Sequence, residues 1–251
     1  MVPITGVLTL APVIVAPFIG SFLGLVIRRL PAGEAIVTGR SVCDRCRRPL
    51  SARDLIPLLS WAVAGAKCRH CGAELGWFYP AVELAAATIA VAAVVLIGDP
   101  VSVWLACGFG WSLLCLSWID AETLLLPDVI TLPLVLAGLA AAIPAGQEGM
   151  LDAGIGAAAG YGVLWLVGRL YQSVSKVQGL GEGDFKLLAA AGAWDGWESL
   201  PWILFTASIL GLAAALVARM TGHEVTRTTR IPFGPFIAAA GWGAYLVQHL
   251  G

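Results

Sequence analysis

Residues 7–27 read VLTLAPVIVAPFIGSFLGLVI, an apolar run without a charged side chain. A helix that crosses the hydrocarbon core of a bilayer needs about 20 predominantly apolar residues. The run is long enough to do so, and no basic segment precedes it. We therefore expect a first transmembrane helix within residues 1–27 and not a cleaved signal peptide.

The composition of the whole chain agrees with a membrane protein. Of its 251 residues, 59% are hydrophobic and only 12% are charged. A soluble domain usually carries about 25% charged residues, so this chain has too little polar surface to coat a globule in water. The net charge of −1 gives no reason to expect a nucleic-acid partner, whereas a lipid bilayer is an expected partner.

Seven further apolar segments follow the first. Together, the eight segments are residues 7–27, 78–97, 101–118, 129–145, 153–172, 185–195, 200–218 and 232–250. Segment 185–195 is shorter than an ordinary span, which indicates a half-helix or a helix that begins deep in the protein. We expect an all-α membrane protein of about eight transmembrane helices, with one long connector at residues 28–77.

The distribution of charge predicts the orientation. With eight crossings and the N-terminus outside, all fifteen lysines and arginines fall in or beside cytosolic connectors. The outer connectors then hold acids and no base: Asp99, Glu148, Asp152, Asp195 and Glu198. This is the pattern of the positive-inside rule.

Residues 28–77 form the polar module of the chain and contain four of its six cysteines. Cys43-x-x-Cys46 and Cys68-x-x-Cys71 have the spacing of two zinc knuckles, and four thiolates close a tetrahedral shell around a structural zinc ion. Thiolates require a reducing compartment, so we expect this module in the cytosol. The alternatives are a redox pair, unmetallated thiols or a basic loop that fixes topology. We expect the other two cysteines, Cys107 and Cys115, to be packing residues.

Three aspartates stand at the edges of apolar segments, where a carboxylate is costly and indicates a functional site. They are Asp120, Asp128 and Asp184, and the expected topology puts all three at the cytosolic end of the membrane. Two facing carboxylates at close range share a proton, which is the arrangement of aspartic proteases. The alternative is that they begin helices as capping or first-turn acids, which suits Asp128 and Asp184 but not Asp120.

Two glycines precede the third aspartate in Gly181-Glu182-Gly183-Asp184. We expect Gly181 and Gly183 to permit close backbone approach and a positive φ, leaving room for an extended peptide beside the acid. Lys186 either stabilises the ionised form of a neighbouring carboxylate or extends to the membrane interface.

With these residues assembled, the chain resembles the type 4 prepilin peptidase family of GxGD intramembrane aspartyl proteases. The resemblance covers nearly the whole length and rests on motifs in order. They are GSFLGLVIRRLP at 20–31, the two CxxC knuckles, DLIPLLSW at 54–61, YPAVE at 79–83, Ile119-Asp120 through Leu126-Pro127-Asp128, GEGDFKL at 181–187 and IPFGPF at 231–236.

The resemblance implies a function and a site. It implies cleavage of the short basic leader from type IV prepilin or type II secretion pseudopilin precursors, at the cytosolic face of the bacterial inner membrane. It assigns Asp120 and Asp184 as the catalytic pair, with Asp128 as the alternate partner. It further implies N-methylation of the new N-terminus with S-adenosylmethionine, whose binding residues we do not assign. Gly24 and Leu55 stand where the family pattern leads us to expect asparagine, which removes polar groups that bear on methyl transfer.

We accordingly divide the chain into a first transmembrane helix (1–27), a cytosolic four-cysteine zinc module (28–77) and a transmembrane aspartyl protease domain (78–251). Two other functional classes remain. A transporter or channel would use the intramembrane acids to bind a cation or relay protons, although no internal repeat of the transporter type is evident. A membrane scaffold with a zinc loop would need the cysteines and none of the acids.

Overall fold

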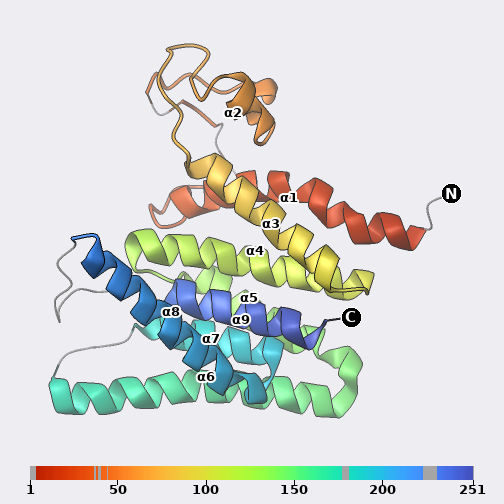
Figure 1. Cartoon of the computed structure of the whole chain (residues 1–251), viewed down its shortest axis with the longest axis vertical. Helices are drawn as coiled ribbons and strands as arrows, with labels where there is room; N and C mark the ends of the chain where they lie inside the picture. The colour runs from red at the N-terminus through yellow and green to blue at the C-terminus, as the bar shows by residue number, and fades with distance from the viewer. Residues whose placement is uncertain are drawn as a thin grey trace. The chain divides into compact units, whose positions relative to one another are not determined.

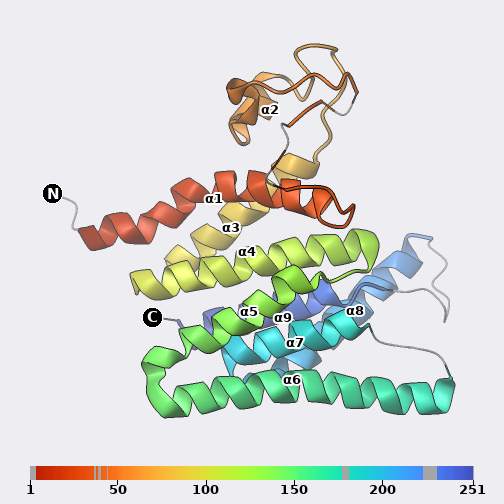
Figure 2. The same cartoon turned by 180° about the vertical axis from the view of Figure 1, so that it is seen from behind.

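The structure is a computed structural model that describes residues 4–36, 38, 41–43, 45–176, 181–222 and 231–250. Figures 1 and 2 show an almost wholly helical chain. Within the described ranges the only β pairings are two isolated bridges, Val42 with Pro49 and Lys67 with Glu74. The prediction of an all-α protein is confirmed.

Each of the eight predicted segments corresponds to one long helix. These are α1 (Ile4–Arg29), α3 (Phe78–Leu96), α4 (Pro100–Thr123), α5 (Asp128–Ala141), α6 (Gly146–Ser175), α7 (Glu182–Asp195), α8 (Leu200–Met220) and α9 (Gly234–Gln248). The four-cysteine module adds the short helix α2 (Leu59–Val63) and a 3₁₀ turn at Ala52–Leu55.

Five stretches of the described residues are long and apolar enough to cross a membrane. They are Gly6–Arg29, Phe78–Leu96, Pro100–Thr123, Asp128–Ser175, which contains both α5 and α6, and Trp197–Met220. Helix α7 has 14 residues and α9 has 15. At a rise of 1.5 Å per residue α7 is about 21 Å long, shorter than the hydrocarbon core. That α7 and α9 cross the membrane stays a prediction.

The chain forms two compact units. Residues 1–111 make the first and residues 112–250 the second, so the boundary falls inside α4. In the first unit α1 packs on α3, and Gly20 makes the contact close because a Cβ there would lie 2.5 Å from the Cα of Glu83. Trp111 Nε1 links the middle of α4 to α3 by donating to the Ala86 carbonyl at 3.0 Å. The predicted boundary at residue 78 stays a prediction.

In the second unit α7 is the central helix, in contact with α5, α6, α8 and α9. Ten of its fourteen residues are buried. Its contact with α6 is backbone to backbone, since a Cβ on Gly156 would lie 2.1 Å from the Gly192 carbonyl oxygen and one on Gly160 would lie 2.5 Å from that of Leu188. Small residues four apart allow such approach between membrane helices. The short α7 is therefore enclosed by protein, and its N-terminal end carries Asp184.

Candidate functional site

Asp120 lies in the last turn of α4 and is 5% exposed. Its Oδ2 accepts a hydrogen bond of 2.9 Å from the backbone N–H of Gly234, the first residue of α9. A helix N-terminus stabilises a nearby carboxylate through its free N–H groups and its dipole. A carboxylate in the last turn of a helix, as Asp120 is in α4, interacts unfavourably with the dipole of that helix. The N-terminus of α9 compensates by supplying a hydrogen-bond donor.

Asp184 lies in the first turn of α7 and is 8% exposed. Gly181 is the cap residue of this helix, and the backbone N–H of Asp184 donates to the Gly181 carbonyl at 3.2 Å. Asp184 is thus a first-turn acid of α7, which agrees with the alternative prediction that it is a capping or first-turn residue. That structural role does not account for its burial beside a second acid.

The two aspartates share one cavity of about 230 Å³. Its lining consists of Asp120, Leu124, Leu125, Leu126, Gly181, Glu182, Gly183, Asp184 and Lys186. Asp120 and Asp184, 64 positions apart in the sequence, thus line the same cavity. Two carboxyl groups that face each other at close range share a proton, and such a pair supplies a proton acceptor and a proton donor.

The two glycines of the GxGD segment act through space and not through unusual backbone angles. The expected positive φ is wrong, because Gly181 has φ −77° and Gly183 is within α7, outside the set of positive-φ glycines. A Cβ on Gly183 would lie 2.7 Å from the Cβ of Leu126, and one on Gly181 would lie 3.4 Å from Asp184 Oδ2. The absent side chains let the start of α7 approach the 124–127 connector and keep the cavity open.

Asp128 lies outside the cavity. It is the first residue of α5, where it complements the helix dipole, and its side chain is 55% exposed. Its Oδ1 lies 2.6 Å from Lys186 Nζ, so the base reaches Asp128 and forms an ion pair with it. The geometry brings Asp120 and Asp184 together and leaves Asp128 in a helix-starting role.

The four knuckle cysteines converge in the first unit. Their sulfur atoms lie within 4.8 Å of one another, and Cys43 Sγ is 4.0 Å from Cys71 Sγ. Zinc–sulfur bonds of about 2.3 Å in a tetrahedron require sulfur atoms about 3.8 Å apart, so the cluster fits a metal ion. The backbone N–H groups of Cys46 and Arg45 lower the pKa of Cys43 to about 7, which favours the thiolate that binds metal.

The two knuckles have the same backbone geometry. In the first, Arg47 N donates to the Cys43 carbonyl at 2.8 Å, and in the second Gly72 N donates to that of Cys68 at 2.8 Å. The residue that follows each second cysteine is left-handed, with φ 57° at Arg47 and 69° at Gly72. Such matched turns point both pairs of sulfur atoms toward one centre.

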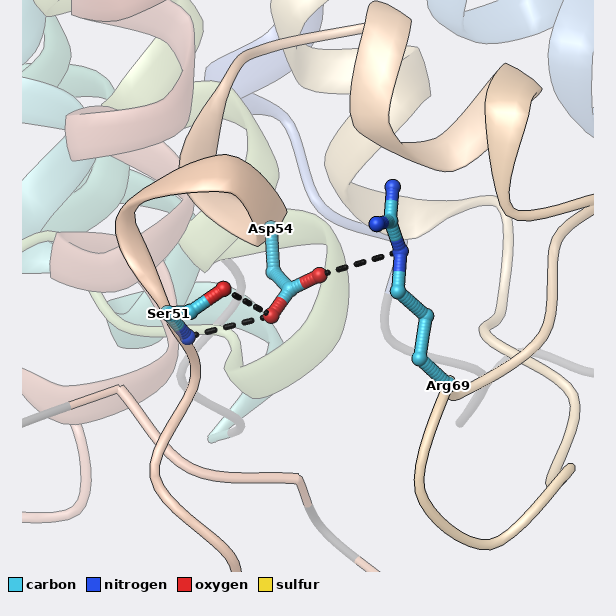
Figure 3. Close-up of polar contacts among 3 residues, drawn as sticks. All are labelled: Ser51, Asp54 and Arg69. Carbon is cyan, nitrogen blue, oxygen red and sulfur yellow. Dashed lines mark hydrogen bonds and ion pairs between the residues drawn. The ribbon is translucent and has the colours of Figure 1, made fainter.

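An ion pair also links the 3₁₀ turn that follows the first knuckle to the second knuckle (Figure 3). Asp54 Oδ2 accepts hydrogen bonds from the Ser51 hydroxyl at 2.7 Å and the Ser51 backbone N–H at 3.0 Å. Arg69, inside the second knuckle, places Nε 3.3 Å from Asp54 Oδ1. The hydrogen bonds from Ser51, with the nearby Arg69 charge, lower the pKa of Asp54. This contact holds the segment after the first knuckle to the second knuckle without a metal ion.

Comparison with known proteins identifies the family of this chain. Residues 14–97 match the family model of the bacterial peptidase A24 N-terminal domain, and residues 107–216 match that of the type IV leader peptidase family. A protein named prepilin leader peptidase/N-methyltransferase from Aeromonas hydrophila is 38% identical, over 91% of this chain and 87% of its own length. The chain belongs to the type IV leader peptidase family.

Other family members with the same name are about as similar. The protein from Burkholderia pseudomallei strain K96243 is 37% identical over 94% of this chain and 84% of its own length. The protein from Pseudomonas aeruginosa is 37% identical over 94% of this chain and 89% of its own length. No solved structure matches the chain significantly.

Sequence reasoning missed the role of Gly234 in this family member. The glycine lies in the IPFGPF motif, but the motif itself does not tell which residue it contacts. A Cβ on Gly234 would lie 2.7 Å from Asp120 Oδ2, so only glycine allows the observed hydrogen bond without a shift. A glycine at the first helical position, where alanine would serve the helix better, was the available signal.

The two departures from the expected family pattern have different surroundings. Gly24 packs against Tyr79, since a Cβ on Gly24 would lie 2.8 Å from that ring. Leu55 is exposed at the end of the 3₁₀ turn in the four-cysteine module. At the first position a larger side chain requires the tyrosine to move, whereas at the second the side chain is 46% exposed.

Proposed function

We propose that this protein is an aspartic endopeptidase that removes the leader peptide of type IV prepilins or type II secretion pseudopilins, with Asp120 and Asp184 as its catalytic pair. The observation that carries the proposal is one cavity lined by two buried aspartates from α4 and α7. The names of the relatives, prepilin leader peptidase/N-methyltransferase, supply the substrate class.

The reaction follows from one proton shared by two carboxyl groups. The ionised aspartate accepts a proton from a water molecule, which attacks the scissile carbonyl carbon, while the protonated aspartate donates to the carbonyl oxygen. The tetrahedral intermediate then collapses as the leaving amine takes up a proton from the pair. Gly234 N–H keeps Asp120 oriented throughout, and the open face left by Gly181 and Gly183 admits an extended peptide.

The site suits a substrate that arrives from the aqueous end of the helices. The cavity lies where α4 ends and α7 begins, and the exposed Glu182 is part of its lining. We place this end of the helices and the four-cysteine module at the cytosolic face of the bacterial inner membrane, with the N-terminus outside, because that orientation keeps lysine and arginine inside. A basic leader then remains in the cytosol while its apolar continuation lies in the bilayer.

Zinc is the metal that best fits the four thiolates, and its role is structural. Four protein ligands leave no open coordination position for a reactive water. Cys43, Cys46, Cys68 and Cys71 would hold the ion, which stabilises a module with little core of its own.

N-methylation of the newly formed N-terminus is a second candidate activity, favoured by the names of the relatives. S-adenosylmethionine would be the methyl donor. Mass spectrometry of the processed product separates this activity from proteolysis, because methylation adds mass to the mature peptide only.

The test is cleavage of a synthetic prepilin by the purified full-length protein in vesicles. Asp120→Asn and Asp184→Asn should each abolish cleavage and retain the helical fold. The matched control Asp128→Asn should cleave at a rate within about fivefold of wild type, because it breaks only an exposed ion pair. Normal cleavage by both single variants would refute the catalytic pair. Ion flux that depends on Asp184, without any peptide cleavage, would establish a transporter instead. If the aspartate variants behaved as wild type and only the cysteine variants lost function, the protein would be a scaffold.

A further inference from the structure

The four-cysteine module contains a stretch that does not resemble the rest of it. Residues 55–66, LIPLLSWAVAGA, contain no charged side chain, although residues 28–77 as a whole carry nine bases and four acids. An apolar stretch of 10–14 residues belongs either in a protein core or at a membrane interface.

This stretch is not a core. Leu55, Ile56, Leu59 and Val63 are between 45% and 71% exposed within the described residues. Leu59 and Val63 are four apart within α2, the spacing that puts side chains on one helical face, and Leu55 lies in the 3₁₀ turn before it. Contiguous exposed apolar side chains on an otherwise polar module mark a binding surface.

The attachment of α2 to α3 defines the depth of this surface. Leu58 N, which precedes α2, donates to Glu83 Oε2 at 2.7 Å. Glu83 lies five residues after Phe78, the first residue of α3, which is about 7.5 Å along that helix. The start of α2 therefore lies within reach of a side chain from the second turn of a candidate span, and Figure 1 shows α2 close to the N-terminal end of α3.

An aromatic contact also holds the middle of α2 at the start of α3. Trp61 in α2 packs on Trp77 with ring centroids 4.2 Å apart, and Trp77 immediately precedes α3. Tryptophan at the end of a span is typical of the membrane–water interface. Both contacts hold α2 beside the first turns of α3, which would lie at the headgroup level of a bilayer that α3 spans.

The charges around the stretch match a lipid surface. Arg53 before it and Lys67 after it are exposed, and the module has an excess of five bases over acids. Basic side chains beside an apolar helical face favour binding to anionic headgroups.

We propose that residues 55–66 form an interfacial segment that inserts Leu55, Leu59 and Val63 into the headgroup–acyl boundary of an anionic phospholipid bilayer. The proposal rests on α3 spanning that bilayer and does not depend on peptidase activity. The segment fastens the four-cysteine module to the membrane surface at a point separate from its two covalent links to α1 and α3.

Photo-crosslinking from single positions tests the proposal. A benzophenone amino acid replaces Leu59 or Val63 in the full-length protein, reconstituted in vesicles of phosphatidylethanolamine and phosphatidylglycerol. Leu84, exposed on α3 next to Glu83, is the control for a lipid-facing position, and Arg48, exposed in the first knuckle, is the control for an aqueous one. Mass spectrometry identifies the adducts after irradiation.

Lipid adducts at Leu59 and Val63 should match those at Leu84 and exceed those at Arg48 by about tenfold, as expected for side chains buried in acyl chains. They should decrease when phosphatidylcholine replaces both lipids. Adducts to other parts of this chain, or to an added prepilin, would overturn the proposal, as would an absence of lipid adducts while Leu84 gives them. Because all four positions are exposed, the substitutions leave the packing intact.

Discussion

Replacing Gly234 by alanine should strongly lower the peptidase activity without unfolding the protein. The new Cβ would lie 2.7 Å from Asp120 Oδ2 and 3.1 Å from Asp120 Cγ. An ordinary contact between heavy atoms is about 3.5 Å, so the carboxyl group or the start of α9 must move by about 0.8 Å. That movement lengthens the hydrogen bond from Gly234 N–H, which holds Asp120 at 2.9 Å.

The magnitude follows from the precision that catalysis requires. A displacement of about 1 Å at a reacting group costs about 100-fold in rate. We therefore expect kcat/KM of Gly234→Ala to fall about 30- to 100-fold. Initial cleavage rates of a synthetic prepilin measure this loss, and circular dichroism with a thermal melt verifies the fold.

Gly243→Ala is the matched control, since it makes the same chemical change in the same helix where a Cβ meets nothing within 4 Å among the described residues. It should retain full activity and gain roughly 0.5–1 kcal/mol from the better helix former. Wild-type activity in Gly234→Ala, or an equal loss in both variants, would refute the argument that this glycine positions Asp120.

Three further predictions concern other parts of the molecule. Gly183→Ala should lower the cleavage rate about tenfold, because its Cβ would lie 2.7 Å from the Leu126 side chain. The loss should be smaller than for Gly234→Ala, since the Leu126 side chain can move, and unchanged initial rates would show that the contact is unimportant. Asp195→Val should stabilise the protein by about 1–3 kcal/mol, because neither carboxyl oxygen of the buried Asp195 has a hydrogen-bond partner among the described residues. A thermal melt measures this change, and destabilisation would show that a bound water or ion satisfies the carboxyl group. Chelation of zinc, or Cys71→Ser, should increase amide hydrogen exchange over residues 41–76 and leave α7 protected, whereas unchanged exchange would show that the module folds without metal.

The helices could be predicted because their signal is local. A run of apolar residues long enough to span a bilayer is visible in the sequence alone, and each of the eight predicted segments has its helix. The meeting of Asp120 with Asp184 followed from topology, since an even number of crossings returns the chain to the same side. The metal cluster could also be predicted, because the CxxC spacing of each cysteine pair is a local sequence pattern that determines how its two sulfur atoms are placed.

What could not be predicted depends on contacts between distant residues. Gly234 and Asp120 are separated by 114 positions, and no local pattern relates them. The exposed face of α2 was missed because charge was averaged over residues 28–77, which concealed an apolar stretch in the middle. For Gly183 the expected close approach is found and the expected positive φ is not, but the sequence did not tell that Leu126 is the residue it approaches.

Helix α4 belongs to both compact units, because the boundary between Trp111 and Ser112 falls inside Pro100–Thr123. Expressing the halves as separate polypeptides at that boundary would sever the helix that carries Asp120 and expose broken backbone hydrogen bonds in the middle of a candidate span. The natural place to divide the gene is the connector at residues 97–99, between α3 and α4. A fragment that begins there keeps Asp120, Asp184 and Gly234 on one polypeptide, so complementation between the two fragments would report what the amino-terminal part contributes to the protease.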